Sequence, residues 1–111
     1  MNYKIDVTPK FERDVRKLSK KHKSLLADLL LFRELLKGDP TQGVALGKDC
    51  YKIRLAISSK GKGKRGGGRV ITYVKVVQET VYLLAVYDKS ERDTISEQEL
   101  NDMLQEAGLG V

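Results

Sequence analysis

Hydrophobic and polar residues alternate at the start of the chain and predict a short half-buried strand over residues 3–7. Thr8 followed by Pro9 predicts a helix start, because threonine caps a helix and proline suits its first turn. Apolar residues then recur at helical spacing, and the other face of this helix is basic. A second, leucine-rich helix follows over residues 25–37, and we expect Gly38 to end it in a left-handed conformation.

The middle of the chain predicts a loop followed by three strands. Residues 38–49 hold glycine and proline and are expected to form the loop. Residues 50–57 and 69–77 alternate between apolar and polar side chains, whereas residues 81–87 are apolar on both faces, as in a central strand. In the second of these strands we expect Val76 to face the core.

The C-terminal part predicts a short helix. Ser96 with Glu99 three residues later is the capping-box pattern, and apolar residues at helical spacing continue to Ala107. The element order is therefore strand, helix, helix, three strands, helix, in one domain over residues 1–111. We predict an α+β fold in which a small, mostly antiparallel four-stranded sheet packs against the two N-terminal helices, with a polar, positive region on its other face.

Charge is unevenly distributed along the chain. The net charge is +6, yet residues 90–111 carry one basic and six acidic side chains. This asymmetry predicts an anionic partner, most often nucleic acid. The chain shows no signal peptide and no apolar stretch long enough to span a bilayer, so we expect a cytoplasmic protein without a membrane partner. The single cysteine, Cys50, excludes a disulfide within the chain, and we expect no cofactor.

The most basic region runs from Cys50 to Lys75, with eight Lys or Arg residues and no Asp or Glu. Strand geometry places Lys52 and Arg54 on one face, and Arg69 can join them across the hairpin. Neighbouring cations repel one another, which favours a site for a bound anion. The alternative is that an acidic side chain of the C-terminal helix neutralises them within the chain.

The loop between the first two of the three strands interleaves glycine with cations. Residues 61–66 match the dinucleotide fingerprint G-x-G-x-x-G, but a strand is predicted to follow where that fingerprint needs a helix, which excludes nucleotide binding of that kind. The loop instead favours contacts along a phosphate backbone, and the alternative is a flexible hairpin loop with solubilising charges. Its predicted RNA-binding residues are Lys60, Lys62, Lys64 and Arg65.

Two tyrosines are expected near the same cations from strand parity, Tyr73 and Tyr87. Tyrosine can stack on a base or bind a phosphate, and it is also an ordinary strand residue. Lys89 follows the last strand, where site residues often emerge. His22, the only histidine, is expected to be exposed. A pair of catalytic histidines is therefore excluded, and no carboxylate cluster supports a two-metal site, so RNA cleavage would be metal-independent.

These residues resemble the RelE/HigB toxins of bacterial type II toxin–antitoxin systems. The resemblance covers almost the whole chain in element order and is most specific in three stretches: DCYKIRL at residues 49–55, GKGKRGGGRVITY at 61–73 and VYLLAVYDKSER at 81–92. It implies a small sheet against two helices and cleavage of mRNA on the ribosome by attack of a ribose 2′-hydroxyl on its phosphate. It also implies inhibition by a cognate antitoxin, whose acidic helix would cover the cations.

The resemblance implies roles for individual residues. Lys52 and Arg54 match the basic pair of the family's strand, and Arg69 matches an arginine that steadies the scissile phosphate. Lys89 falls in a basic cluster after the last sheet strand, with Arg92 three residues further on. Arg92 and Tyr73 are predicted, with the loop cations, to bind RNA. Guanidinium groups suit the doubly charged transition state of this reaction, because they stabilise it electrostatically.

The chain departs from the family at two positions. RelE-type toxins have a general-acid arginine where Ser90 stands and a general-base tyrosine near Ile95–Ser96. We therefore expect Tyr87 or Lys89 to act in their place. Two other functions stay open: a ParE-like toxin acting on a DNA topoisomerase, and a basic RNA-binding module without catalysis. The predicted catalytic residues are Lys52, Arg54, Arg69, Tyr87 and Lys89.

Overall fold

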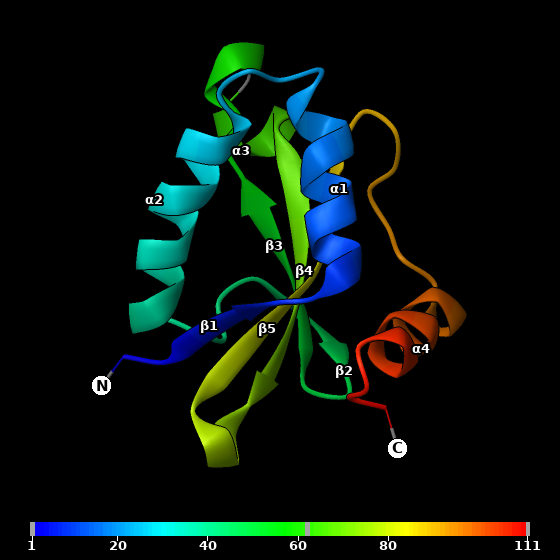
Figure 1. Ribbon diagram of the computed structural model, residues 1–111. Coiled ribbons are helices and arrows are strands. Elements are labelled where there is room, and N and C mark those ends of the chain that lie inside the picture. Colours follow the sequence, from blue (N-terminus) through cyan, green and yellow to red (C-terminus); the bar gives the residue numbers. More distant parts are fainter. Residues whose placement is uncertain (1, 62, 111) are drawn as a thin grey trace.

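Five strands form one sheet in the order β1-β5-β4-β3-β2 in the computed structural model, which describes residues 2–61 and 63–110 (Figure 1). The strands are β1 (Lys4–Val7), β2 (Val44–Gly47), β3 (Cys50–Leu55), β4 (Gly68–Lys75) and β5 (Thr80–Asp88). The helices are α1 (Pro9–Ser19), α2 (Leu25–Gly38), α3 (Gly63–Gly66) and α4 (Glu97–Glu106). Strand β1 runs parallel to β5, and the other three pairs are antiparallel. The predicted α+β fold is confirmed.

The predicted number of strands is wrong, because part of the expected loop over residues 38–49 is strand β2. This strand has four residues and pairs with β3, with Val44 opposite Lys52 and Ala45 opposite Tyr51. It is an edge strand with a bulge and largely exposed side chains, so it lacks the alternation that identifies a half-buried strand.

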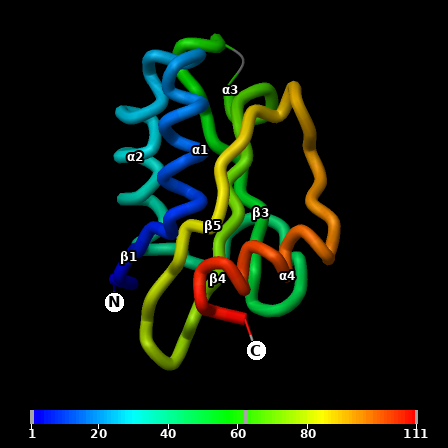
Figure 2. Tube along the Cα trace, turned by 45° about the vertical axis from the view of Figure 1, so that its right-hand side comes forward, coloured from blue at the N-terminus to red at the C-terminus, as the bar shows by residue number. Residues whose placement is uncertain are grey.

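Two hydrophobic cores lie on the two faces of the sheet. On one face α1 and α2 bury Phe11, Leu18 and Leu36 against the sheet. On the other face α4 covers a second core, in which Met103 and Leu104 belong to the same cluster as strand residues. Figure 2 shows α1 and α2 on one side of β5 and α4 on the other. Because both faces are covered, β5 is apolar on both, as its sequence predicts.

Helix ends follow from local side-chain chemistry. The Thr8 hydroxyl accepts a hydrogen bond from Phe11 N at 3.3 Å, and Ser96 with Glu99 forms the predicted capping box. The predicted left-handed cap at Gly38 is wrong, since Gly38 is the last residue of α2 and the cap residue after it is Asp39, with φ −144°. Asp39 precedes Pro40, and the residue before a proline is pushed out of the helical region.

The strand predicted over residues 69–77 ends earlier than expected. Strand β4 stops at Lys75, and Val76–Gln78 forms a 3₁₀ turn. Val76 is therefore 63% exposed and does not face the core. Glu79 completes this tight connection to β5 with a positive φ of 48°. Among the described helices, none combines the length and the hydrophobicity needed to cross a bilayer.

Candidate nucleic-acid interface

Three strands place a row of polar side chains across the face of the sheet opposite α1 and α2. Arg54 on β3 lies directly opposite Arg69 on β4, and Arg69 lies directly opposite Tyr87 on β5. Lys52 is two residues from Arg54 on the same strand and so shares its face. The prediction that these three cations come together on one face is confirmed. We call Lys52, Arg54, Arg69 and Tyr87 the basic row.

Arg69 is the most enclosed member of the basic row, with 4% of its surface exposed. Its Nη1 atom donates to the carbonyl of Gly68 at 2.8 Å and to that of Lys64 at 3.3 Å, and its Nη2 atom donates to the carbonyl of Arg65 at 3.3 Å. Its Nε atom donates to Oδ1 of Asp93 at 3.0 Å. The guanidinium therefore holds helix α3 in place and is not open to an external ligand in this structure.

Asp93 also neutralises Lys52. The Lys52 ammonium donates to the Asp93 carbonyl oxygen at 2.8 Å and lies 4.0 Å from its carboxylate oxygen Oδ1. The expectation of an open positive surface at Lys52 and Arg69 is therefore wrong. The alternative of an internal counter-charge is realised, although Asp93 precedes α4 and does not belong to it.

Arg54 remains the accessible cation of the basic row. Its side chain is exposed, and within residues 2–61 and 63–110 no hydrogen bond or ion pair involves it. It faces the buried Arg69 across the β3–β4 ladder, and Asp93 is paired with Arg69 and Lys52 but makes no ion pair with Arg54. The electrostatic argument for an anion site therefore depends on Arg54 more than on its neighbours.

Lys60 does not extend along the surface as predicted. Its ammonium lies 2.5 Å from Oδ1 of Asp88, and its side chain is 10% exposed. His22 is also less exposed than expected, at 14% for its side chain, and its Nε2 atom lies 2.8 Å from Oδ2 of Asp88. Ser90 donates to the same carboxylate from its backbone N at 2.9 Å. The buried Asp88 thus ties the loop, the turn after α1 and the end of β5 together.

Asp88 is held in its charged form. Burial alone would raise the pKa of its carboxyl, but hydrogen bonds from Lys60, Ser90 and His22 lower the pKa below its usual range. Sequence reasoning missed this residue, because nothing in the stretch around Asp88 shows that two distant segments, at His22 and at Lys60, converge on it. Asp88 is therefore a structural centre next to Tyr87 of the basic row, because its buried negative charge is matched by three hydrogen-bonding partners.

A second carboxylate anchors the start of the glycine-rich loop. Asp28 on α2 accepts hydrogen bonds from Ser58 N at 2.9 Å and from the Ser58 hydroxyl at 2.6 Å. Its other hydrogen bond comes from the Ser24 hydroxyl at 2.7 Å. Burial raises the pKa of Asp28, but these hydrogen bonds outweigh burial and lower it. The loop is therefore fastened to the helical layer at its first turn.

The glycine-rich loop contains a single helical turn, α3, before β4 begins at Gly68. The strand predicted after the glycines is confirmed, so the dinucleotide interpretation stays excluded. Lys64 and Arg65 on α3 are exposed, whereas Lys62 lies outside the described residues. A Cβ atom on Gly67 would lie 2.1 Å from the carbonyl oxygen of Leu55, so glycine is required for α3 to approach β3.

The two tyrosines lie at different ends of the same face. Tyr73 is four residues from Arg69 along β4, roughly 13 Å at strand spacing, and its ring stacks on Tyr82 at 6.0 Å under α4. The structure does not bring Tyr73 to the basic row. Tyr87 belongs to the row, and burial raises the pKa of its phenol.

Residues 89–94 connect β5 to the region of α4, and all six side chains are exposed. We call this segment the strap. Lys89 begins it, and Arg92 lies over the Tyr87 ring, 5.6 Å from the ring centre to the guanidinium carbon. The Arg92 guanidinium also donates to Glu99 at 2.6 Å, which lowers the pKa of Glu99 to about 2. Arg92 is thus engaged within the chain, although its side chain is 40% exposed.

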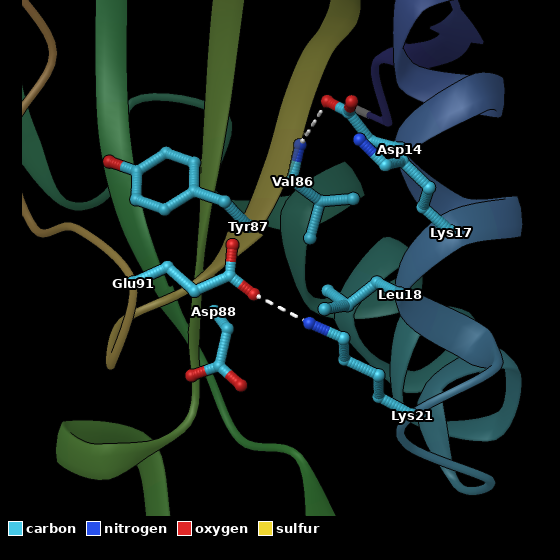
Figure 3. Close-up of a pocket in the computed structure, with 8 residues that line it drawn as sticks. All are labelled: Asp14, Lys17, Leu18, Lys21, Val86, Tyr87, Asp88 and Glu91. Carbon is cyan, nitrogen blue, oxygen red and sulfur yellow. Dashed lines mark hydrogen bonds and ion pairs between the residues drawn. The ribbon is translucent and has the colours of Figure 1, made fainter.

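A polar cavity of about 240 Å³ lies between α1 and β5, on the side of the strand away from the Tyr87 hydroxyl (Figure 3). Figure 3 shows Lys21 reaching across its mouth to Glu91 of the strap, at 3.3 Å. Asp14 accepts a hydrogen bond from Val86 N at 3.2 Å on its opposite wall. Within the described residues, no group of three or more His, Cys, Asp or Glu side chains is placed to hold a metal ion.

The fold and the basic row define a class: small α+β proteins that present clustered cations at one end of a mostly antiparallel sheet. Residues 4–109 match the family described as the RelE toxin of the RelE/RelB toxin–antitoxin system. The chain therefore belongs to the RelE toxin family, and it is a toxin of a toxin–antitoxin system.

Solved structures share the fold. A mutant of the E. coli toxin RelE in the free state is 21% identical, with a TM-score of 0.58 over 97% of this chain and 96% of that one. The toxin–antitoxin complex RelBE2 of Mycobacterium tuberculosis provides a match at 19% identity and TM-score 0.57, covering 79% and 99%. The E. coli mutant bound to a peptide of the antitoxin RelB is 22% identical, with TM-score 0.53 over 86% and 100%.

Proposed function

We propose that this protein cleaves mRNA on the ribosome and that the basic row is where the scissile phosphate binds. The observation that carries the proposal is the alignment of Arg54, Arg69 and Tyr87 across three neighbouring strands, with Lys52 beside them. Guanidinium groups bind phosphate oxygens through two parallel hydrogen bonds, which suits a phosphate that gains charge as it reacts. Family membership supports the same reaction class.

The reaction is an internal transfer. The ribose 2′-oxygen attacks its own 3′-phosphate and loses its proton to water, and the bond from phosphorus to the 5′-oxygen breaks. The products are a cyclic phosphate and a 5′-hydroxyl. Arg54 and Lys52 stabilise the doubly charged transition state, and Lys89 adds positive charge at the end of β5. The ribosome supplies the orientation of the substrate.

Tyr87 is the proton donor that we propose for the leaving group of this reaction. Its hydroxyl carries a proton at neutral pH, as an ordinary tyrosine does, and burial raises the pKa of the Tyr87 phenol further. It can then give that proton to the leaving 5′-oxygen. In this role it would replace the general-acid arginine of RelE-type toxins, because Ser90 stands at that position. The His22 ring is engaged with the Asp88 carboxylate, so we do not assign it this role.

A cognate antitoxin is the second part of the proposal. Helix α2 exposes Leu26, Leu30, Leu31 and Leu35, each at 61% or more. A groove of about 750 Å³ between α1, α2 and β1 continues this apolar face. Apolar patches rimmed by charge mark protein interfaces in small soluble proteins. We place an amphipathic antitoxin helix here, in addition to the acidic segment expected over the cations.

Inducible expression in a bacterial host, with RNA 5′ ends mapped, tests the activity. Arg54→Ala should abolish growth arrest and cleavage, whereas Lys4→Ala, an equal change of charge on β1, should preserve both. Arg54 is a better choice than Arg69, because Arg69 also fastens α3. Intact mRNA with DNA damage would favour action on a topoisomerase, and RNA binding without cleavage on ribosomes would favour a binding module.

A further inference from the structure

We infer that Asp93 occupies the phosphate position between Lys52 and Arg69 and that the strap must open before RNA can bind there. The inference rests on the proposed function, because it concerns the same site. Asp93 meets Arg69 Nε at 3.0 Å and Lys52 through both its carbonyl and its carboxylate. A carboxylate and a phosphodiester are both anions that accept hydrogen bonds from these groups, so they compete for one place.

The two cations have little capacity left for a second anion. Three of the Arg69 hydrogen bonds go to backbone carbonyls, two of them in α3, and Nε is the donor that points to Asp93. Lys52 has 18% of its side chain exposed, whereas Asp93 has 49%. The cations are therefore enclosed and their partner is the exposed member. Removing Asp93 opens the site without moving the strands that carry the cations.

The base of the strap is fixed by Ser90, which donates to the buried Asp88 carboxylate, whereas residues 91–94 beyond it are held by polar contacts near the surface. Glu91 pairs with Lys21, and Arg92 pairs with Glu99 and donates to the carbonyl of Thr94. All six strap side chains are exposed and none is hydrophobic. Exposed ion pairs contribute about 0–1 kcal/mol each, so a segment held in this way opens without disturbing the core. Figure 1 shows the strap leaving the upper end of β5 and running outside the sheet down to α4.

The strap thus keeps the basic row closed in the isolated protein. Arg54 is the exception, since it stays exposed while its two neighbours are covered. A nucleic-acid strand can make its first contact at Arg54 and at the exposed Lys64 and Arg65, and then replace Asp93. Closure of this kind limits phosphate binding by a protein with a net charge of +6, which attracts every nucleic acid.

The test compares Asp93→Asn with Asp102→Asn. Both remove one negative charge, but Asp102 lies on α4 and bonds Gln98 at 2.9 Å, away from the basic row. The probe is a short fluorescent RNA with 2′-O-methyl groups, which binds but cannot be cleaved. Asp93→Asn should bind it about three- to tenfold more tightly than wild type, and the log–log salt dependence should steepen by about 0.7 for the added phosphate contact.

Asp102→Asn should leave the salt slope as in wild type. Equal affinity gains in the two variants would show a general charge effect and overturn the inference. Weaker binding by Asp93→Asn would show that Asp93 positions Arg69 for the substrate, which also overturns it. Glu91→Gln provides a second route if Asp93→Asn is unstable, because it releases the strap from Lys21 without touching the basic row, and it should raise affinity in the same direction.

The inference and the proposed function fail in different ways. Tighter binding by Asp93→Asn with no RNA cleavage on ribosomes would support the closed strap and contradict the proposed nuclease activity. RNA cleavage by the wild type with unchanged binding by Asp93→Asn would support the nuclease activity and contradict the closed strap. The Nε–H signal of Arg69 in a nitrogen-15 spectrum reports the contact directly, and it should shift on addition of the probe.

Discussion

His22 and Asp88 meet at 2.8 Å, Nε2 to Oδ2, and this contact fastens the turn after α1 to the end of β5. The same carboxylate lies 2.5 Å from the Lys60 ammonium, so the glycine-rich loop is held at the same point. The Asp88 side chain therefore joins the turn after α1 and the glycine-rich loop to the end of β5, the strand that carries Tyr87 of the basic row.

Asp88→Asn is expected to lower the free energy of unfolding by about 3 kcal/mol, because it leaves the enclosed Lys60 ammonium without its counter-charge. Urea unfolding of the purified protein measures this. Asp102→Asn is the control and should change the free energy by less than about 0.5 kcal/mol, since its side chain is exposed. Equal effects of the two variants would contradict a structural role for Asp88.

Acid should destabilise the protein through Asp88 and Asp28, whose pKa values lie below the ordinary 3.8 in the folded state. A carboxyl with a lowered folded pKa contributes stability that is complete above its unfolded pKa and is lost as pH falls through the folded pKa. Stability should therefore be flat down to about pH 5 and fall below about pH 4. Urea unfolding at a series of pH values gives the free energy of unfolding as a function of pH, and Asp88→Asn should make its fall in acid smaller.

Gly67→Ala is expected to lower the free energy of unfolding by about 1–3 kcal/mol, because the new methyl group would overlap the Leu55 carbonyl oxygen and force α3 away from β3. Gly38→Ala is the matched control. No atom lies within 4 Å of a Cβ built on Gly38, so this change in α2 should be neutral or slightly stabilising. If thermal unfolding found the two variants alike, the close approach of α3 would not be a constraint.

Tyr87→Phe should slow RNA cleavage on ribosomes by about a hundredfold or more, because it removes the proposed proton donor. Stability should be unchanged, since the hydroxyl makes only a long contact of 3.5 Å with the Asp93 carbonyl oxygen. Tyr82→Phe, at the other end of β5, is the control and should cleave as wild type does. Wild-type cleavage by Tyr87→Phe would assign the proton transfer to another group.

Leu30→Ser should leave stability within about 0.5 kcal/mol of wild type, because Leu30 is 62% exposed. It should weaken the complex with the cognate antitoxin about tenfold, since it places a polar group in the apolar groove. Val77→Ser is the control, as Val77 is 93% exposed on the β4–β5 turn and far from α2 in the sequence. Unchanged antitoxin affinity of Leu30→Ser, measured by calorimetry, would place the antitoxin elsewhere.

Local chemistry predicted much of the fold. Alternation located β1, β3 and most of β4, and a continuous apolar run located most of β5. The cap at Thr8 and the capping box at Ser96 located two helix starts, because these signals act within a few residues. Strand β2 escaped prediction since a four-residue exposed edge strand carries little alternation. The end of β4 was misplaced, because the 3₁₀ turn at Val76 is set by the tight connection to β5.

The sequence by itself determined that Lys52 and Arg54 share one face, because strand side chains alternate with a period of two, and it allowed Arg69 to join them across the hairpin, as the observed register shows. Tertiary structure decided which of them is accessible. Asp93 reaches Arg69 across 24 residues and Asp88 reaches Lys60 across 28. Such pairings depend on where the strap and the loop come to lie after folding, and no periodicity in the chain encodes that distance.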